Sequence, residues 1–387
     1  MSSIVQYVAR PAPKQSEIVN HVAAMIASGK LPPGSQIPSF SQIAEQFGTT
    51  LTTAQRAVHH LSKQGYIITK QGKGNFVVPN PPQLCHFGIV FTQSPTYSQY
   101  FKAWQAEAAR LNTEDAAAPD GRRRRFSFFY PGDLSGIVPA YEKLLAEQQA
   151  HNLAGLVFTQ NPWPFADTPL VKDPDLPRVA VSFWPVEGIR GVSLNTDELN
   201  DRYMAYLAAR GRRRIAVILP NVAMQEIDSV VNSWLARAQR YGLVIKPHHV
   251  QAIGFDHAKW AANYAQVLMS ANRDERPEGL VIADDNYIPY ATAGIAAAGI
   301  RVPDDLDVVG YCNFPHPPPR AVPVKLMGLD IRRAVRTCIE IIERLRRGED
   351  VPMNNLLPVC TDDDYPELDG ELQRAASGCC KDAAAPD

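Results

Sequence analysis

Residues 18–78 read IVNHVAAMIASGKLPPGSQIPSFSQIAEQFGTTLTTAQRAVHHLSKQGYIITKQGKGNFVV, and this stretch decides the fold of the N-terminal part of the chain. Apolar side chains recur at helical spacing from its start, which predicts a helix over residues 15–28. That helix ends at Gly29, a residue that readily takes the left-handed turn at a helix end. A second helix is predicted between Ser39, which has the side chain of an N-cap, and Gly48.

A third helix begins at Thr50 or Thr52, either of which can cap it, and it has one apolar and one polar side. The polar side shows Thr53, Gln55, Arg56 and His59. A short helix, a tight turn and a longer helix with a polar outer face form the geometry that lays one helix in the major groove of DNA. The stretch therefore indicates a helix-turn-helix, with double-stranded DNA as the first partner to test.

The residues after the third helix change from helical to alternating spacing. Residues 66–70 and 75–78 are predicted strands, joined by a hairpin at residues 71–74 whose glycines permit positive φ. Lys70 and Lys73 place two cations on this hairpin, where DNA phosphate or a minor-groove edge would be met. Three helices followed by such a hairpin are typical of a winged helix-turn-helix.

The whole stretch resembles the DNA-binding domain of the GntR family of bacterial transcription regulators, over about residues 1–80. The residues that carry the resemblance are Gly29, Leu31, Pro33-Gly34, Ile37-Pro38-Ser39, Ile43-Ala44, Phe47-Gly48, Thr52-Thr53, Ala57, Leu61, Gly65-Tyr66 and Gly72-Lys73-Gly74-Asn75-Phe76-Val77. Two arginines that are usual in the family are absent, because Ser41 and Leu51 occupy their positions. The resemblance therefore implies an operator that differs from the family's usual one, or weaker binding.

The resemblance also implies a set of DNA-contacting residues. Bases would be read by Thr53, Gln55 and Arg56. Phosphates would be contacted by Thr50, Thr52, Lys70 and Lys73. The predicted DNA-binding set is completed by Ser39, Ser41 and Gly74.

Charge is unevenly distributed along the chain. Residues 1–80 contain seven Lys and Arg against two Glu, a local net charge of +5 in a chain whose total is −1. Residues 361–387 contain two Lys and Arg against eight Asp and Glu, a net charge of −6. Because residues 362–387 have almost no large apolar side chains, they are predicted to be a disordered tail, which either solvates the chain end or competes with DNA for the basic domain.

Length and composition favour a globular protein of two or three domains, with 387 residues of which 45% are hydrophobic and 20% charged. The chain has no run of about eighteen apolar residues and no signal-peptide core, so we expect a cytoplasmic protein that has no membrane partner. The six cysteines include no Cys-x-x-Cys pair and are expected to be thiols rather than disulfides or zinc ligands.

The chain lacks the sequence motifs of serine hydrolases, zinc proteases and P-loop enzymes. Asp284 and Asp285 are neighbours, but adjacent side chains at a strand end diverge and do not form an acid/base pair. GntR-type domains also occur fused to aminotransferase-like domains that use pyridoxal phosphate, but that fusion needs a longer second part and a Schiff-base lysine. We therefore expect no enzymatic activity, no cofactor and no metal.

The rest of the chain is predicted to be a linker followed by a two-lobed α/β domain. Residues 79–84 are rich in proline and form the linker, which makes residues 1–78 the first domain. Residues 85–361 alternate short apolar strands with helices in two series, which implies two lobes with parallel sheets covered on both faces. An insertion at residues 112–125 ends in four arginines and is predicted to be a solvated loop, with a second nucleic-acid patch as the alternative.

A second resemblance covers about residues 84–360, which look like the effector domain of LacI-type regulators and are similar to type I periplasmic sugar-binding proteins. The segments that carry it are residues 279–286, GLVIADDN, residues 297–311, AAGIRVPDDLDVVGY, and the shorter residues 192–196 and 210–216. Such domains bind a small molecule in the cleft between two lobes, at the carboxyl ends of parallel strands.

Asp285 falls where this family has its ligand-binding aspartate, whereas Cys312-Asn313 replaces an aspartate pair and the usual sugar-clamping arginine is absent near Val230. A carboxylate suits adjacent sugar hydroxyls, so Asp285 keeps a carbohydrate ligand open. Aromatic side chains at strand ends could stack on a sugar face or pack the lobes. The predicted effector-binding set is Tyr97, Tyr100, Trp163, Phe165, Trp184, Asp285, Tyr287, Asn313 and Phe314.

These patterns favour a DNA-binding transcription regulator that responds to a small-molecule effector. The resemblances imply a repressor, and a homodimer is expected because two half-sites multiply the few base contacts of one winged helix. The alternative is a small-molecule sensor or interaction scaffold whose winged helix has lost specific DNA reading, given Ser41 and Leu51.

Overall fold

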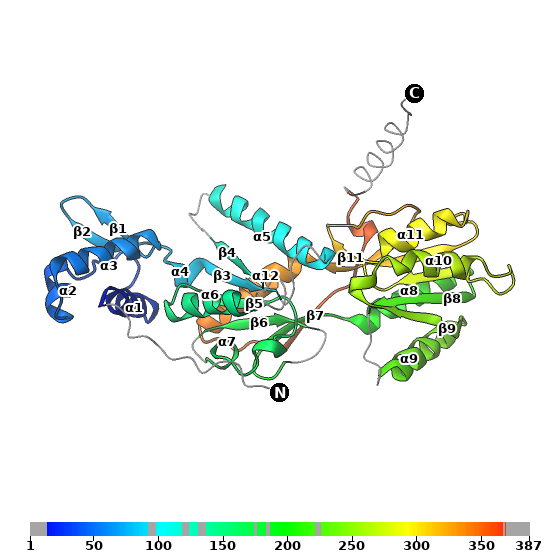
Figure 1. Ribbon diagram of the computed structural model, residues 1–387, viewed down its shortest axis with the longest axis horizontal. Helices are drawn as coiled ribbons and strands as arrows, with labels where there is room; N and C mark the ends of the chain where they lie inside the picture. The colour runs from blue at the N-terminus through cyan, green and yellow to red at the C-terminus, as the bar shows by residue number, and fades with distance from the viewer. Residues whose placement is uncertain are drawn as a thin grey trace, which may run out of the picture. The chain divides into compact units, whose positions relative to one another are not determined.

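The computed structural model describes residues 14–91, 98–117, 124–130, 137–173, 176–182, 186–220, 226–366 and 368. They form a winged helix and two α/β lobes (Figure 1), so the predicted α/β class and the order of the parts are confirmed. In the part of the chain so described, no helix is both long and apolar enough to cross a membrane.

The winged helix has the three predicted helices and the predicted hairpin. Its elements are α1 (Lys14–Ala27), α2 (Phe40–Gln46), α3 (Leu51–Lys63), β1 (Ile67–Lys70) and β2 (Gly74–Val77). The apolar sides of the helices pack into one core, because their buried residues recur every three or four positions. The strands pair antiparallel, and both hairpin glycines have positive φ, +71° at Gly72 and +104° at Gly74, as the sequence predicts.

The first lobe is built on a six-stranded sheet in the order β13-β7-β6-β5-β3-β4. Its elements are β3 (His86–Val90), α5 (Gln99–Ala117), β4 (Arg125–Phe129), α6 (Ile137–Gln149), β5 (Gly155–Phe158), the 3-10 turn η3 (Trp163–Phe165), α7 (Pro169–Lys172), β6 (Arg178–Val181), β7 (Arg190–Leu194) and β13 (Asn354–Leu357). The pairs β3–β4, β3–β5, β5–β6 and β7–β13 are parallel. The strands β3 and β5 are buried along their whole length, as expected for strands covered on both faces.

The second lobe is built on a six-stranded sheet in the order β14-β12-β11-β10-β8-β9. Its elements are α8 (Thr196–Ala209), β8 (Arg214–Pro220), α9 (Ile227–Arg240), β9 (Val244–Ile253), η5 (Phe255–His257), α10 (Trp260–Met269), β10 (Gly279–Ile282), α11 (Ile288–Ala297), β11 (Asp307–Phe314), β12 (Lys325–Asp330), β14 (Cys360–Thr361) and η6 (Asp362–Asp364). Helix α12 (Ile331–Arg346) follows β12, and its last residues belong with the first lobe, where Ile342 lies beside Gly155 of β5. All pairs are parallel except β12–β14. The strand order reverses between β8 and β10, and open α/β sheets bind ligands beside such a switch point.

Three predicted boundaries need correction. The linker is shorter than residues 79–84, because Pro82–Cys85 forms one helical turn, α4, with proline at its first position, where a missing N–H costs nothing. The predicted loop at 112–125 is partly helical, since α5 continues to Ala117. Arg124 forms a salt bridge of 2.5 Å with the buried Asp115, which neutralises its charge, so Arg124 is not part of a free basic patch. Arg122 and Arg123 lie outside the described residues.

The tail begins later than residue 362. Lys325 binds Asp362 and Asp363 at 2.5 and 2.7 Å, which holds η6 against β12. The ring of Tyr365 stacks on Phe314 with centroids 4.6 Å apart, and Leu368 is buried in the core of the second lobe. These residues therefore belong to the lobe, and the prediction of a disordered tail now concerns residues outside the described part.

Candidate DNA-binding face and effector site

Helix α3 separates an apolar from a polar side along its whole length. The buried side consists of Ala54, Ala57, Val58 and Leu61. The exposed side presents Thr52, Gln55, Arg56, His59, His60 and Lys63. With Gln15 of α1, the exposed residues line an open hollow on the surface. A polar stripe that crosses three helical turns is suited to reading the edges of bases in a groove.

Two of the predicted DNA-contacting side chains, those of Ser39 and Thr50, already serve as helix caps. The Ser39 hydroxyl accepts a hydrogen bond from the Gln42 backbone N–H at 3.3 Å, and the Ser39 N–H donates to Gln42 Oε1 at 2.8 Å, which forms a capping box on α2. The Thr50 hydroxyl accepts from the Thr53 N–H at 3.2 Å, and the two threonine hydroxyls lie 3.0 Å apart. Ser39 thus fixes the start of α2, and Thr50, with the Thr53 hydroxyl beside it, fixes the start of the recognition helix α3, whether or not these side chains also touch DNA.

Thr50→Ala is expected to destabilise the winged helix by about 1 kcal/mol, because it leaves an N-terminal N–H of α3 without its acceptor. Thr50→Ser keeps the hydroxyl and is expected to restore most of that loss. Urea unfolding of both variants measures the effect. Equal midpoints for Thr50→Ala and the wild type would show that the cap contributes nothing.

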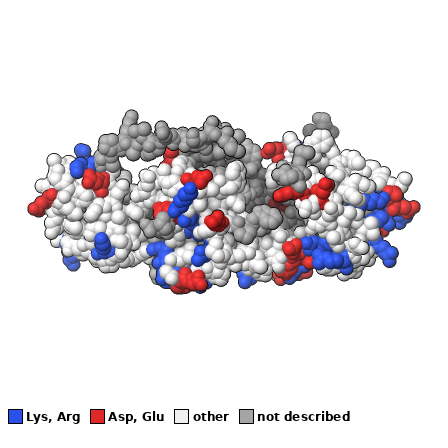
Figure 2. Space-filling model, turned by 90° about the horizontal axis from the view of Figure 1, so that it is seen from below, with Lys and Arg blue, Asp and Glu red and all other residues white. Residues whose placement is uncertain are grey.

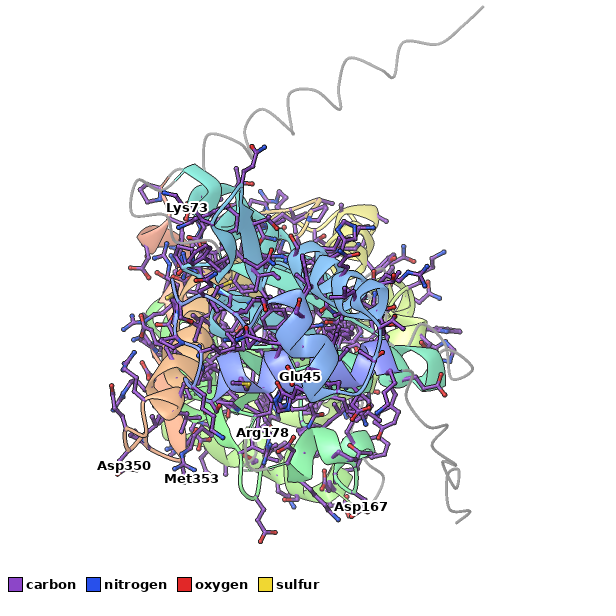
Figure 3. The ribbon with its side chains drawn as sticks, turned by 90° about the vertical axis from the view of Figure 1, so that its left-hand side faces the viewer. Glu45, Lys73, Asp167, Arg178, Asp350 and Met353 are labelled. Carbon is purple, nitrogen blue, oxygen red and sulfur yellow. The ribbon has the colours of Figure 1, made fainter. Side chains whose placement is uncertain are left out.

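The wing carries the predicted cations in two different settings. The Lys70 Nζ lies 4.6 Å from the centroid of the Phe76 ring, a cation–π contact that directs the ammonium across the hairpin. Lys73 lies at the tip of the hairpin, apart from Glu45 on α2 (Figure 3), and its carbonyl accepts a hydrogen bond from Gln36 Nε2 at 3.0 Å. Ser41 and Leu51 are exposed, with Leu51 53% accessible at the start of α3.

Charge alone does not mark the binding face. Figure 2 shows one face of the molecule, on which basic and acidic side chains lie interspersed. The polar stripe of α3 and the lysines of the wing therefore define the candidate DNA-binding face by geometry more than by a large basic patch. The DNA contacts of these residues stay predictions.

In the second lobe, the ends of two adjacent strands bring a carboxylate and an amide together. Asp285 follows β10 and Asn313 lies near the end of β11, and each is 1% exposed. Asn313 Nδ2 donates a hydrogen bond to Asp285 Oδ2 at 2.6 Å. Because β10 and β11 are parallel neighbours, their carboxyl ends meet at one edge of the sheet, beside the switch point.

The neighbouring Asp284 has separate partners. Its Oδ1 accepts hydrogen bonds from the Asn286 backbone N–H at 2.9 Å and from Asn286 Nδ2 at 2.8 Å. Asn286 Oδ1 in turn accepts from the Gln99 backbone N–H at 3.0 Å, so the first turn of α5 lies beside this loop. Burial raises the pKa of both carboxyl groups, and the charge of Asp284 raises the pKa of Asp285 further.

Two tyrosines extend this polar cluster. The Tyr311 hydroxyl donates to Asn313 Oδ1 at 3.0 Å. Burial raises the pKa of Tyr311, and the charge of Asp285 adds to the shift. Tyr100 adjoins Gln99, whose backbone N–H donates to Asn286 Oδ1, so Tyr100 begins beside the same loop. We call Tyr100, Asp284, Asp285, Asn286, Tyr311 and Asn313 the carboxylate–amide site. Such a set can accept from and donate to the hydroxyls of a small polar ligand.

The predicted effector-binding residues lie in different parts of the structure. Tyr100, Asp285 and Asn313 come together in the carboxylate–amide site. Tyr287 and Phe314 are 0% exposed in the core of the second lobe, where Tyr287 stacks on Phe255 and Phe314 on Tyr365, so packing accounts for both rings and we leave them out of the site. Tyr97 and Trp184 lie outside the described residues.

The last two predicted aromatics lie in the turn after β5. Trp163 is 76% exposed, whereas Phe165 is buried. The Phe165 ring stacks on Tyr141 of α6, with centroids 6.4 Å apart and an interplanar angle of 8°. Phe165 therefore links the turn to α6, and Trp163 keeps an open aromatic face.

The sequence patterns did not identify Tyr311 and Asn286 of the carboxylate–amide site, or His60 and Lys63 at the C-terminal end of the α3 stripe. Tyr311 lies two residues before Asn313 on one strand, and period-two alternation places both on the same face. His60 and Lys63 follow Arg56 at helical spacing, so the same 3.6-residue period that located the core also locates them.

Comparisons with known proteins agree with both parts of this geometry. The family model of bacterial regulatory proteins of the GntR family matches residues 14–77, and the model of periplasmic binding protein-like domains matches residues 204–362. The arabinose metabolism transcriptional repressor of Geobacillus stearothermophilus is 22% identical over 322 residues, which are 78% of this chain and 82% of that protein. The lactose operon repressor of Escherichia coli is 24% identical over 156 residues, 40% of this chain and 41% of that protein.

Solved structures show the same fold for the two lobes. The LacI family transcriptional regulator from Lactobacillus casei with bound glucose has a TM-score of 0.53 and 18% identity, and the match covers 71% of this chain and 97% of that chain. The LacI family transcriptional regulator from Arthrobacter sp. in complex with lactose has a TM-score of 0.54 and 15% identity, with 72% and 97% covered. The chain thus combines a winged helix of the GntR family with a periplasmic binding protein-like domain.

Proposed function

We propose that this chain is a ligand-responsive transcription regulator, acting as a repressor, whose winged helix binds operator DNA and whose two-lobed domain binds a small molecule. The observation that carries the proposal is the exposed polar stripe of α3, presented on a helix whose caps and buried side fix its orientation. A repressor is supported by the names of the relatives, among them the arabinose and lactose operon repressors. Because operator DNA is the proposed partner, we propose that the protein acts in the cytoplasm.

The proposed ligand is a neutral sugar or a related polyol. The carboxylate–amide site offers acceptors on Asp285 and both a donor and an acceptor on Asn313, which matches the alternating needs of adjacent hydroxyls. Two buried carboxylates close to each other disfavour an anionic ligand, because like charges repel strongly away from water. The sugars bound in the related structures, glucose and lactose, support the same class.

The proposed active form is a homodimer on a palindromic operator. One recognition helix offers few base contacts, whereas two helices a whole number of DNA turns apart multiply the affinity. Ligand binding regulates such a dimer only if the ligand prefers one arrangement of the subunits, because equal affinity for both arrangements shifts nothing.

Fluorescence anisotropy of the full chain on its own upstream DNA tests the proposal. We expect binding at least about a thousandfold tighter than to a scrambled fragment, with an affinity that falls steeply as salt rises. A panel of arabinose, glucose and lactose, added at saturating concentration, is expected to contain a sugar that weakens the complex. Equal, weak affinity for both DNA fragments would instead support the sensor or scaffold without specific DNA reading.

A further inference from the structure

The junction between the winged helix and the first lobe centres on a single tyrosine. Tyr66 lies between α3 and β1, and its ring is 0% exposed in the core of the winged helix. Its backbone is fixed on both sides, since its N–H donates to the Leu61 carbonyl and its carbonyl accepts from the Val78 N–H, each at 3.0 Å. The ring is therefore a rigid part of the DNA-binding domain.

The hydroxyl of this tyrosine leaves the winged helix and reaches the first lobe. It donates to the carbonyl of His151 at 2.5 Å and lies 3.2 Å from the carbonyl of Ala150. Both carbonyls follow the last residue of α6. Burial raises the pKa of the Tyr66 phenol far above its usual range, so the hydroxyl stays a donor at any physiological pH.

The end of α6 has a geometry that leaves these carbonyls in need of a donor. The Asn152 N–H bonds back to the Glu147 carbonyl and the His151 N–H to the Gln148 carbonyl, both at 2.9 Å, which is the Schellman pattern. His151 takes the left-handed φ of +54° that this pattern requires. The carbonyls of Ala150 and His151 lie beyond the helical hydrogen bonds, and they carry the partial negative charge of a helix C-terminus.

Further contacts extend from this point into the sheet of the first lobe. The Asn152 carbonyl lies 2.8 Å from His86 Nδ1, and His86 Nε2 lies 2.7 Å from Ser127 Oγ, so α6, β3 and β4 share one polar chain. Arg346, at the end of α12, donates to the Leu84 carbonyl of α4 at 3.3 Å. The hydroxyl of Tyr66 thus joins a network that already ties the lobe together.

The second turn of α6 contacts the turn that follows β5, through the stack of Tyr141 on Phe165. A helix of 13 residues is rigid over its length of about 20 Å. Helix α6 therefore contacts the turn that carries the exposed Trp163 through Tyr141, and its C-terminal end contacts the winged helix.

We propose that Tyr66 is a positioning residue whose hydroxyl locks the winged helix onto the C-terminal end of α6, so that the first lobe and the recognition helix move as one body. Docking of the two parts stands on the contacts above and does not require DNA binding. Its consequence, that a displacement of α6 reorients the recognition helix, rests on the proposed function.

Two pairs of variants separate docking from general destabilisation. Tyr66→Phe keeps the buried ring and removes only the donor, and its match is Tyr264→Phe in the second lobe, whose buried hydroxyl has no hydrogen-bond partner among the described residues. His151→Val and His151→Gly both remove an exposed side chain. Glycine accepts the positive φ at no cost, whereas a β-branched valine does not and must displace the carbonyl.

The first measurement needs neither ligand nor operator. A dye is placed at position 71, at the exposed wing, and its time-resolved anisotropy is recorded in the full chain. We expect the wild type, His151→Gly and Tyr264→Phe to tumble as one body, and Tyr66→Phe and His151→Val to gain a faster component from a released domain. The rate of amide exchange at residues 147–154 is expected to rise about two- to tenfold in the same two variants, because one hydrogen bond is lost. Decays of Tyr66→Phe and His151→Val equal to the wild type would overturn the docking.

The second measurement addresses the consequence on DNA. We expect the change in affinity for upstream DNA caused by arabinose, glucose or lactose to shrink at least about fivefold in Tyr66→Phe and to persist in Tyr264→Phe. An unchanged response in Tyr66→Phe would overturn the transmission through α6. If the wild type binds no DNA specifically, the proposed function fails, while the anisotropy decays still decide whether the hydroxyl docks the domain.

Discussion

Arg56→Ala is expected to weaken binding to the specific operator by about tenfold or more, while binding to scrambled DNA changes little. Arg56 is exposed at the middle of the α3 stripe, where an arginine can form paired hydrogen bonds to a guanine edge. Loss of one such pair removes about 1–3 kcal/mol of discrimination. The caps of α3 and its buried side are untouched, so the fold should keep its stability. Anisotropy titrations on both DNA fragments measure the ratio.

Lys30→Ala is the matched control for charge, because it removes one exposed cation of the same domain that does not line the hollow along α3. We expect Lys30→Ala to weaken binding to both DNA fragments slightly and by the same factor. Lys73→Ala, at the tip of the wing, is expected to lower the salt dependence by about one phosphate contact without changing sequence preference. If Arg56→Ala lowered both affinities by the same factor, Arg56 would be a phosphate contact and the reading of bases would lie elsewhere.

Asp285→Asn is expected to weaken sugar binding by about tenfold to a hundredfold and to remove the sugar-dependent rise in melting temperature. A hydrogen bond to a charged acceptor contributes about 1.5–3 kcal/mol, and the substitution replaces a carboxylate by an amide of the same size. The amide oxygen can still accept from Asn313, so the site keeps its shape. Affinity for DNA in the absence of sugar should match the wild type.

Asp304→Asn controls for a lost carboxylate in the same lobe, since its side chain is 65% exposed and outside the site. It should respond to sugar as the wild type does. Calorimetric titration with the sugar that shifts the wild-type melting temperature compares all three proteins. A normal response in Asp285→Asn would place the ligand somewhere other than the carboxylate–amide site.

The same substitution should change how stability depends on pH. Burial raises the pKa of Asp284 and Asp285, so between the unfolded value of about 3.9 and the raised folded values the native state binds more protons than the unfolded state. This pair therefore lowers the stability as pH rises through that window. Asp285→Asn is expected to flatten the fall and to melt at a higher temperature than the wild type near pH 7. Parallel melting curves across pH would contradict a buried charged pair.

Much of the winged helix could be predicted because its signals are local. Gly29, Ser39, Gly48 and the hairpin glycines each impose a backbone conformation by their own chemistry, so the elements fall within one or two residues of their predicted bounds. The order of strands and helices in the lobes followed from their alternation in the same way. The predicted class is confirmed for that reason.

The site was harder to predict because it depends on contacts between distant residues. Tyr287 and Phe314 have the same sequence context as ligand-contacting aromatics, and only the packing of Phe255 and Tyr365 against them shows that they belong to the core. The hydrogen bond of Asn313 to Asp285 joins positions 28 residues apart. The capping roles of Ser39 and Thr50 are local, yet the same hydroxyls suit phosphate, and residue type alone does not separate the two uses.

The clean division of α3 into a buried and an exposed side has an evolutionary consequence. Substitutions at Thr52, Gln55, Arg56 or His59 change no core contact and no cap, so each is expected to cost the fold about half a kcal/mol or less. Selection can therefore redirect such a protein to a new promoter one base at a time while the sensor and the scaffold stay as they are. Duplicated copies of the gene could diverge in target long before they diverge in shape.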